Sequence, residues 1–497
     1  MKRPRWRLRY AAIAVAGCTV AATAPFGATL AQAGAPGPSV HLVAAQNTIT
    51  VPRFGHDVFL DPGIYVESLG SALQFNVQRA SYAKPVTIRQ VIHLPGGGTE
   101  FRSLPASLLD GLSGLRNFVR LKVRNSKGKV VAAERSTFCP DVFDPQRATP
   151  DSPATSPYPL FGCESDPFQI ATAWGVQKGW GVDPFEFNGQ AFRLRLGTYK
   201  VTATITSKYR HLLNISAADA TAHVTAIVVK GTGCCGQARG PAHGKGGTLP
   251  RLPKAQNLNN PPRDVLPDLT PAPSWGIGVS HIRKTKRSPS RDELDFGATV
   301  WIGGNGPLDV EGFRSNGSPT MKAFQYFFRN GHVIGRTRAG TMGFDTQNGH
   351  EHWHFESFAR YSLLNSAKTV TLRSHKQGFC IAPTDGVNLL LRHAVWQPPQ
   401  FFGFGGGACG SPAALWVQEQ LPLGWGDTYF QSVAGQDFNI THVPNGTYYI
   451  EVVANPGKIL HETNTGNDVS LRKVILGGTR GHRTVRVPAF HGIDPEG

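Results

Sequence analysis

Three histidines at alternate positions, His350, His352 and His354, constrain this chain more than any other short motif. Alternate side chains share one face of a β-strand, whereas on a helix they point in different directions. We therefore expect a strand that presents a row of three imidazoles. Imidazole is the commonest protein ligand of zinc and copper, so the row predicts a metal site. The spacing alone does not choose between copper and zinc.

Strand patterns recur along the chain, and helical periodicity is scarce. Polar and apolar residues alternate over 199–205, 222–229 and 447–453, which predicts half-buried strands. Arg329-Asn330-Gly331 separates two apolar runs and predicts a tight hairpin. Residues 101–115 are a candidate for a short helix. The fold class is therefore mostly β.

The length of 497 residues is too great for one ordinary core, so we expect two β-rich, sandwich-like domains. The first spans 38–230 and carries no catalytic signature. A Gly- and Pro-rich linker follows over 231–262. The second domain spans 264–477, and the basic tail over 478–497 is expected to be poorly ordered.

Residues 1–33 have the pattern of an export signal. Basic residues precede an apolar run, and Ala31-Gln32-Ala33 offers a small-residue cleavage site. The apolar run is too short and too rich in alanine for a membrane span. This pattern favours free secretion. The alternative is a lipid anchor on a bacterial membrane, because Val15-Ala16-Gly17-Cys18 resembles a lipobox that would modify Cys18.

Export places the cysteines in an oxidising compartment, where disulfides are expected. The natural pairs within each domain are Cys139–Cys163 and Cys380–Cys409, and the first would staple a long loop over 140–165. Cys234 and Cys235 are adjacent, and a bond between neighbours is strained. The state of these two cysteines stays open.

The formal net charge of +18 favours anionic partners. An anionic cell-envelope polymer or an acidic protein fits an exported chain. No nucleic-acid partner is expected, because the sequence has no recognition motif and an export signal. A basic surface that only keeps the protein soluble is the simplest alternative.

A series of ordered motifs in the second domain resembles the lysyl oxidase family over about residues 266–476. The histidine row is one of several, so the resemblance is more specific than a lone metal motif. The first domain shares none of it. The other motifs, in order, are Leu266-Pro267-Asp268-Leu269, Ser374-His375-Lys376-Gln377-Gly378-Phe379-Cys380, Gly424-Trp425-Gly426-Asp427-Thr428-Tyr429, Pro444-Asn445-Gly446-Thr447-Tyr448 and Asn455-Pro456.

The resemblance implies copper on His350, His352 and His354 and a lysine tyrosylquinone cofactor made from the chain itself. The two precursor positions of that cofactor fall on Lys376 and Tyr429. The implied reaction is a secreted, copper-dependent amine oxidation that uses O2. It converts a primary amine, with the lysine of a protein as one candidate, to an aldehyde and releases ammonia and hydrogen peroxide.

Asp427 is the candidate base of this reaction, because it lies two residues from Tyr429 and would share its strand face. A structural hydrogen-bond acceptor is the equal alternative for this aspartate. Two other functions compete with the implied one. The first is a catalytically silent adhesion protein that holds structural zinc. The second is a copper oxidase or monooxygenase without a quinone.

The resemblance also implies a calcium site between the start and the end of the second domain, made of hard oxygen ligands. An acidic, amide-rich turn without a metal is the alternative. Two departures from the family concern cysteines: Gly349 stands where the family has one, and the partner position falls near Gly386. The histidine row is therefore expected to lack a nearby covalent staple. The matching calcium ligands are Asp268, the carbonyl of Leu269, Glu462, Asn464, Asn467 and Asp468.

Overall fold

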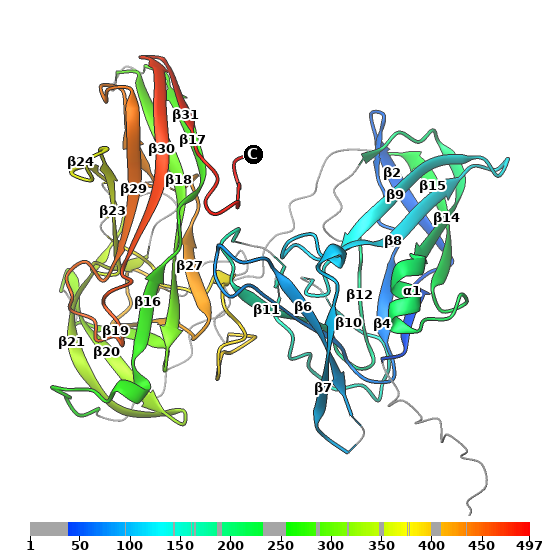
Figure 1. The fold of residues 1–497 in the computed structure, drawn as a ribbon, viewed down its shortest axis with the longest axis horizontal. Helices are drawn as coiled ribbons and strands as arrows, with labels where there is room; N and C mark the ends of the chain where they lie inside the picture. The colour runs from blue at the N-terminus through cyan, green and yellow to red at the C-terminus, as the bar shows by residue number, and fades with distance from the viewer. Residues whose placement is uncertain are drawn as a thin grey trace, which may run out of the picture. The chain divides into compact units, whose positions relative to one another are not determined.

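The computed structural model confirms a mostly β protein, with strands throughout and one short α-helix in the part of the chain that it describes (Figure 1). From residue 38 onward this part belongs to one compact unit. The described residues are 38–94, 96–142, 145–160, 162–163, 166–185, 191–231, 255–284, 289–315, 318–346, 352–374, 376, 378–398, 409–433 and 435–497.

The N-terminal body, defined as the described residues of 38–231, contains three sheets. The first has the order β1-β4-β12-β10, the second β11-β5-β6-β7 and the third β13-β3-β2-β15-β14-β8-β9. The strands are β1 (Val40–Ala44), β2 (Thr48–Phe54), β3 (Asp57–Phe59), β4 (Ile64–Ser68), β5 (Leu73–Gln78), β6 (Thr87–His93), β7 (Thr99–Leu104), β8 (Leu115–Arg124), β9 (Val130–Phe138), β10 (Gln146–Arg147), β11 (Ala171–Val176), β12 (Trp180–Val182), β13 (Ala191–Phe192), β14 (Gly197–Ile205) and β15 (Thr221–Lys230).

Alternating side chains build the core of this body. In β14, Val201, Ala203 and Ile205 are fully buried while the residues between them are not, so the predicted period of two is confirmed. Helix α1 (Ser207–Leu213) covers the same core with Tyr209 and Leu213. The predicted helix over 101–115 is reduced to a 3-10 turn, Ala106–Leu108: residues 101–104 belong to β7, residues 109–114 form a turn, and β8 begins at Leu115.

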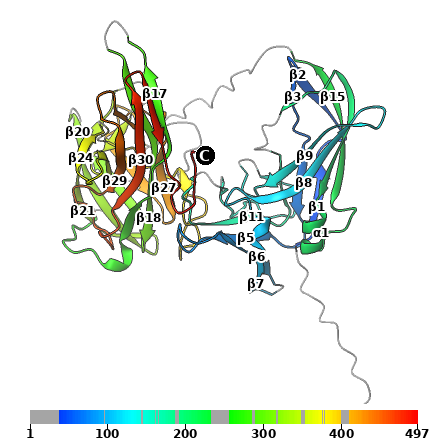
Figure 2. The same ribbon diagram turned by 45° about the horizontal axis from the view of Figure 1, so that its top comes forward.

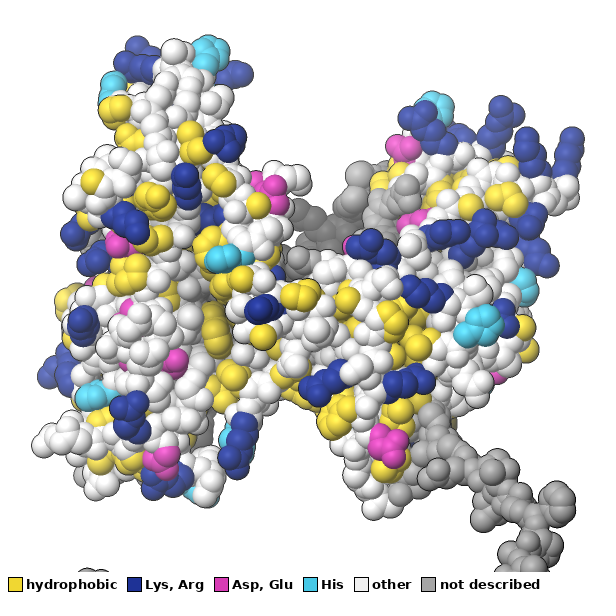
Figure 3. Space-filling model, viewed as in Figure 1, with side chains coloured by type: hydrophobic (Ala, Val, Ile, Leu, Met, Phe, Trp, Pro, Cys, Tyr) yellow, Lys and Arg dark blue, Asp and Glu magenta, His cyan; other side chains and the backbone are white. Residues whose placement is uncertain are grey.

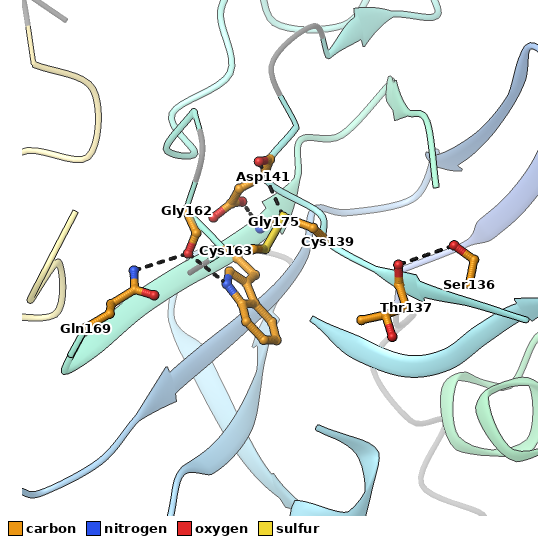
Figure 4. Close-up of a disulfide and its surroundings, with 9 residues drawn as sticks. Ser136, Thr137, Cys139, Asp141, Gly162, Cys163, Gln169 and Gly175 are labelled. Carbon is orange, nitrogen blue, oxygen red and sulfur yellow. Dashed lines mark hydrogen bonds between the residues drawn. A yellow bond between two sulfur atoms is a disulfide. The ribbon is translucent and has the colours of Figure 1, made fainter. Parts of the chain in front are cut away.

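The predicted disulfide Cys139–Cys163 is present and closes the long loop (Figure 4). Beside it, Asp141 accepts a hydrogen bond of 2.9 Å from the N–H of Gly175 on β11. The carbonyl of Gly162 accepts bonds from Trp174 Nε1 and Gln169 Nε2. The loop is therefore fixed to the sheet both covalently and by buried hydrogen bonds.

The C-terminal body, defined as the described residues of 255–497, contains three more sheets. β29 and β30 lie side by side in both views of the ribbon (Figures 1 and 2). A 3-10 turn at Arg263–Val265 precedes the strands, which are β16 (Pro267–Pro271), β17 (Trp275–Ile282), β18 (Arg291–Gly304), β19 (Leu308–Phe313), β20 (Thr320–Arg329), β21 (His332–Phe344), β22 (Trp353–Phe355), β23 (Ala359–Leu364), β24 (Val370–Arg373), β25 (Asp385–Gly386), β26 (Trp416–Leu421), β27 (Trp425–Tyr429), β28 (Asp437–Asn439), β29 (Gly446–Ala454), β30 (Val469–Thr479) and β31 (His482–Arg486).

The predicted hairpin at Arg329-Asn330-Gly331 joins β20 to β21. Asn330 and Gly331 have φ angles of 51° and 79°. Two consecutive positive φ values are what a two-residue hairpin turn requires, and Asn-Gly is the pair that adopts them most readily. The strand predicted over 447–453 is confirmed as part of β29.

The expectation of a poorly ordered tail after Gly477 is wrong. β30 continues to Thr479, and β31 pairs back onto it. Buried Arg472 then donates to the carbonyl of Pro488 at 2.7 Å and to Glu496 at 2.9 Å. A basic segment at the end of a chain predicts disorder, but a buried arginine that needs acceptors holds this end in place.

A short segment that follows the disulfide Cys139–Cys163 forms hydrogen bonds with the C-terminal body. The N–H groups of Ile170 and Ala171 both donate to the carbonyl of Val387, and Leu389 donates back to Ala171. Gln169 Nε2 donates to the carbonyl of Gly386 at 2.6 Å. These bonds adjoin β25, which pairs with β27. In the described residues, no helix is long and apolar enough to cross a membrane.

Candidate active site

Strand β27 brings two of the predicted site residues together. Asp427 and Tyr429 alternate along it, and its register with β18 sets Tyr429 opposite Ala298 and Asp427 opposite Val300. Asp427 is buried, with 3% of its surface exposed. The strand therefore presents a carboxyl and a phenol two residues apart, as the sequence predicts.

The segment that holds Lys376 packs against the same strand. Lys376 Nζ lies over the ring of Tyr429, 4.2 Å from its centroid, and 5.2 Å from the centroid of Phe379. The backbone N–H of Lys376 donates to Ser374 Oγ, which donates in turn to the carbonyl of Gly435. The lysine is thus fixed at its backbone, and its amine is held at the tyrosine ring face.

The phenol of Tyr429 is fixed as well. Its hydroxyl accepts the N–H of Cys380 at 2.7 Å and donates to the carbonyl of the same residue at 3.1 Å. Phe379 packs edge-on against the ring at 5.1 Å. Burial raises the pKa of Tyr429, and the nearby carboxyls of Asp427 and Glu419 raise it further. The ring is therefore a neutral phenol in a fixed orientation.

Burial changes the acid–base state of Lys376. Lys376 is buried, with 8% of its surface exposed, and loss of hydration lowers the pKa of its amine to about 8, against the opposing attraction of Asp427 and Asp345. An ordinary lysine is almost wholly protonated at neutral pH. This one holds a measurable fraction of free amine beside the ring of Tyr429, which is the form that can act as a nucleophile.

Besides Asp345, the carboxyls of Asp427 and Glu419 act on this pair, and Asp385 lies close to Asp427. Of the last three, only Asp427 stands in a sequence motif. Burial raises the pKa of Asp427, Lys376 opposes the rise, and Asp385 adds to it. Glu419 on β26 is 1% exposed, and its Oε2 accepts the N–H of Ile381 at 3.1 Å. Oδ2 of Asp427 and Oε1 of Glu419 are buried without a hydrogen-bond partner.

Glu419 and Asp385 could not be predicted as site residues, because neither stands in a local sequence motif. β26 pairs with β19 in another sheet and contacts β27, and β25 pairs with β27. Their buried carboxyls are recognisable as site residues once the sheets are assembled.

Of the three histidines in the row, the structure describes His352 and His354. His350 lies outside the described residues, and β22 covers only Trp353–Phe355. The rings of His352 and His354 lie 4.7 Å apart, and His354 Nδ1 lies 3.7 Å from Asp345 Oδ2. Two neighbouring imidazoles suit copper or zinc by donor type. No group of three His, Cys, Asp or Glu side chains with metal-binding geometry occurs among the residues described.

The histidine strand contacts the lysine segment directly. Phe355 and Phe379 exchange N–H···O bonds of 2.8 and 3.0 Å. A Cβ on Gly378 would lie 2.6 Å from the Cβ of His354, so only glycine permits this approach. His354, Lys376 and Tyr429 therefore belong to one cluster built from separate parts of the chain.

The expectation that the histidine row lacks a nearby covalent staple is wrong. The predicted disulfide Cys380–Cys409 is present, and the carbonyl of Cys409 accepts the N–H of Trp353 at 2.9 Å. Cys380 also follows Phe379, which pairs with Phe355. The disulfide thus supports the histidine strand through Cys409, which is not the partner that the family resemblance implies. The other half of the disulfide, Cys380, donates its backbone N–H to the hydroxyl of Tyr429.

The candidate calcium ligands gather where β16 meets the segment before β30. The buried oxygens Asp268 Oδ1, Asn467 Oδ1 and Asp468 Oδ1 have no hydrogen-bond donor. Burial raises the pKa of Glu462 to about 7, and Asp468 and Asp268 add to the rise. Leu269 donates its N–H to Glu462 at 3.1 Å. Unsatisfied hard oxygens among like charges fit a bound cation.

Asn464 fits this set least. It is exposed, and its Oδ1 accepts the N–H of Gly466 at 3.0 Å. Asn467 turns its amide nitrogen to Thr270 at 2.9 Å, which leaves Oδ1 for another partner. The described cluster therefore centres on Asp268, Asn467 and Asp468 rather than on all six predicted ligands.

Comparison with known proteins gives a partial resemblance to the lysyl oxidase family. The chain matches no family model. It is 28% identical to lysyl oxidase homolog 2 of Gallus gallus over 141 residues, which are 28% of this chain and 16% of that protein. The human protein of the same name is 26% identical over the same extent. Lysyl oxidase homolog 2A of Danio rerio is 25% identical over 175 residues, 34% of this chain and 21% of the fish protein. The chain thus spans a small part of these relatives.

Proposed function

We propose, from the resemblance to lysyl oxidases and from the pairing of Lys376 with Tyr429, that this protein is a secreted amine oxidase. Its substrate is a primary amine, with the lysine of a protein as one candidate, and its products are an aldehyde, ammonia and hydrogen peroxide. The observation that carries the proposal is the amine of Lys376 at 4.2 Å from the Tyr429 ring centroid, with a pKa lowered to about 8.

His350, His352 and His354 would hold copper, which supplies the redox chemistry that oxidises the ring of Tyr429 with O2. Lys376 and Tyr429 would form the lysine tyrosylquinone, which supplies an electrophilic carbonyl and an electron sink for amine oxidation. The remaining chemistry belongs to the chain. Lys376 presents a free amine to the ring face, and Cys380 holds the phenol oxygen in place.

Asp427 would move the proton in turnover. A general base works best when its pKa lies near the operating pH, and burial shifts this carboxyl in that direction. It stands beside Tyr429 on the strand and beside Lys376 in space. Asp427 is therefore assigned as the acceptor of the α-proton of the substrate amine.

The test is peptide mass spectrometry on protein loaded with copper and matured in air. We expect one cross-linked species that joins the peptides of Lys376 and Tyr429 with the mass of the oxidised adduct. Lys368 provides an internal comparison, because it too lies over a tyrosine ring, 5.8 Å from that of Tyr449, but is exposed. Unmodified Lys376 and Tyr429 peptides, with metal bound and O2 supplied, would refute the quinone.

We predict that the rate of cofactor formation rises about tenfold between pH 7 and pH 9 and is level above that, because only the free amine of Lys376 adds to the ring. Its pKa of about 8 sets the midpoint, since the protonated, unreactive form predominates below it. The measurement is the initial rate of cross-linked peptide formation across this pH range. A rate that keeps rising to pH 10.5 would indicate an ordinary, solvated lysine.

We further propose that Asp268, Asn467 and Asp468 bind Ca²⁺ together with Glu462. Added Ca²⁺ is expected to stabilise the protein by about 3 kcal/mol when it exceeds its Kd a hundredfold. Differential scanning calorimetry with and without EGTA measures this effect. Asp268→Ala should abolish the response to Ca²⁺, whereas Asp264→Ala, an exposed aspartate nearby, should retain it. An equal response in both variants would place the ion elsewhere.

A further inference from the structure

One face of the largest sheet in the N-terminal body carries five cations on three adjacent strands. They are Arg120, Lys122 and Arg124 on β8, Arg135 on β9 and Lys200 on β14. We call this set the cationic face. Arg120, Arg135 and Lys200 are exposed, and Lys122 and Arg124 are half-buried. Figure 3 shows Lys and Arg side chains gathered over the part of this body that holds β8, β9 and β15.

The register places like charges directly opposite each other. Lys200 pairs with Arg124, and Arg120 pairs with Arg135. Residues opposite each other on antiparallel strands have neighbouring side chains, and like charges in such pairs destabilise a sheet. The other positions paired with the five are Thr202, Thr204, Thr225, Val130 and Ala133, so no carboxylate relieves the repulsion. In the described part of the chain, no ion pair involves any of the five.

A groove of about 590 Å³ opens on this face between the ends of the strands. Arg124, Lys200 and His223 line it with neutral donors, which are Asn47, Asn125, Ser126, Thr198 and Thr225. Arginine and lysine together with hydroxyl and amide groups are the side chains that contact phosphate oxygens. A row of phosphates along this groove would relieve the repulsion between the cations and accept hydrogen bonds from the neutral donors beside them.

We propose that the cationic face binds a phosphate polymer that carries no bases, such as a polyol-phosphate chain of a cell envelope. Single-stranded nucleic acids are bound with the help of aromatic side chains that stack on bases. None of the positions paired across β8, β9, β14 and β15 on this face is Phe, Tyr or Trp. Tyr199 also lines the groove, but its side chain is buried from the opposite face of β14, and its hydroxyl donates to the carbonyl of Arg195. The proposal concerns the N-terminal body and stands apart from the amine oxidase chemistry.

The experiment measures binding of fluorescently labelled inorganic polyphosphate to the full chain over a series of salt concentrations. Each cation that contacts a phosphate contributes about −0.7 to the slope of log affinity against log salt. We expect the triple variant Lys122→Gln, Arg124→Gln, Lys200→Gln to bind at least tenfold more weakly and to flatten the slope by about 2. A thermal unfolding scan establishes that the variant is folded.

The matched control is Lys84→Gln, Lys178→Gln, Lys208→Gln, which removes the same charge from exposed positions off this face. It should bind polyphosphate with nearly the affinity of the parent protein. Equal weakening in both triple variants would overturn the proposal, since net charge alone would then explain binding. Tighter binding of single-stranded DNA or of poly-L-glutamate than of polyphosphate would likewise overturn it in favour of a nucleic acid or an acidic protein.

Discussion

Lys376→Arg is expected to abolish amine-dependent hydrogen peroxide production, with a loss of about 10³-fold or more. The variant keeps a cation in the same pocket, but a guanidinium stays protonated and offers no free amine to the ring of Tyr429. Tyr429→Phe should give the same loss, because it removes the phenol that is to be oxidised. Both measurements use protein matured with copper in air and a coupled peroxide assay.

The conservative control is Lys368→Arg, which changes the exposed lysine over Tyr449 and should leave activity unchanged. Copper content and the unfolding temperature of all three variants separate loss of chemistry from loss of the fold. Copper-dependent turnover that survives Lys376→Arg would instead support a copper oxidase without a quinone. Bound zinc, with no turnover in the parent protein either, would support a silent metal-binding protein.

Local alternation explains why so much of the fold could be predicted from the sequence. A strand such as β14 can be predicted because apolar residues occupy every second position, and these are the buried ones. The turn at Asn330 and Gly331 can be predicted because both residue types tolerate positive φ. The tail could not be predicted in this way. Its order depends on Arg472, whose acceptors at Pro488 and Glu496 become apparent only when the sheet is assembled.

In the candidate site, too, the residues that stand in local motifs could be predicted and the others could not. Lys376, Tyr429 and Asp427 stand in motifs that can be read along the chain, and the structure brings them together. Glu419 and Asp385 stand in no motif, because they reach the site through pairing with distant strands. The disulfide Cys380–Cys409 was predicted as a pair, but its support of the histidine strand depends on a backbone bond to Trp353 that spacing cannot reveal.

Asp427→Asn is expected to lower kcat for a primary amine by about 10²–10⁴-fold, the usual contribution of a positioned general base. The amide keeps the shape of the side chain and its place on β27 but cannot accept a proton. Because burial raises the pKa of this carboxyl, its loss should cost little stability near pH 7. Activity is to be expressed per site that reacts with phenylhydrazine, so that an effect on cofactor formation is separated from an effect on turnover.

Asp309→Asn provides the matched control, because this aspartate is also fully buried and burial raises its pKa to about 8, but its hydrogen-bond partners are Gln418 and Gln420. It should change kcat by less than about threefold. With an amine deuterated at the α-carbon, the Asp427 variant should show a larger isotope effect on kcat than the parent protein, because proton abstraction becomes slower relative to the other steps. If Asp427 has only a structural role, its substitution should lower the number of sites that react with phenylhydrazine and leave the isotope effect unchanged. In that case Glu419, which is buried with a carboxyl oxygen that has no hydrogen-bond partner, becomes the next candidate for the base.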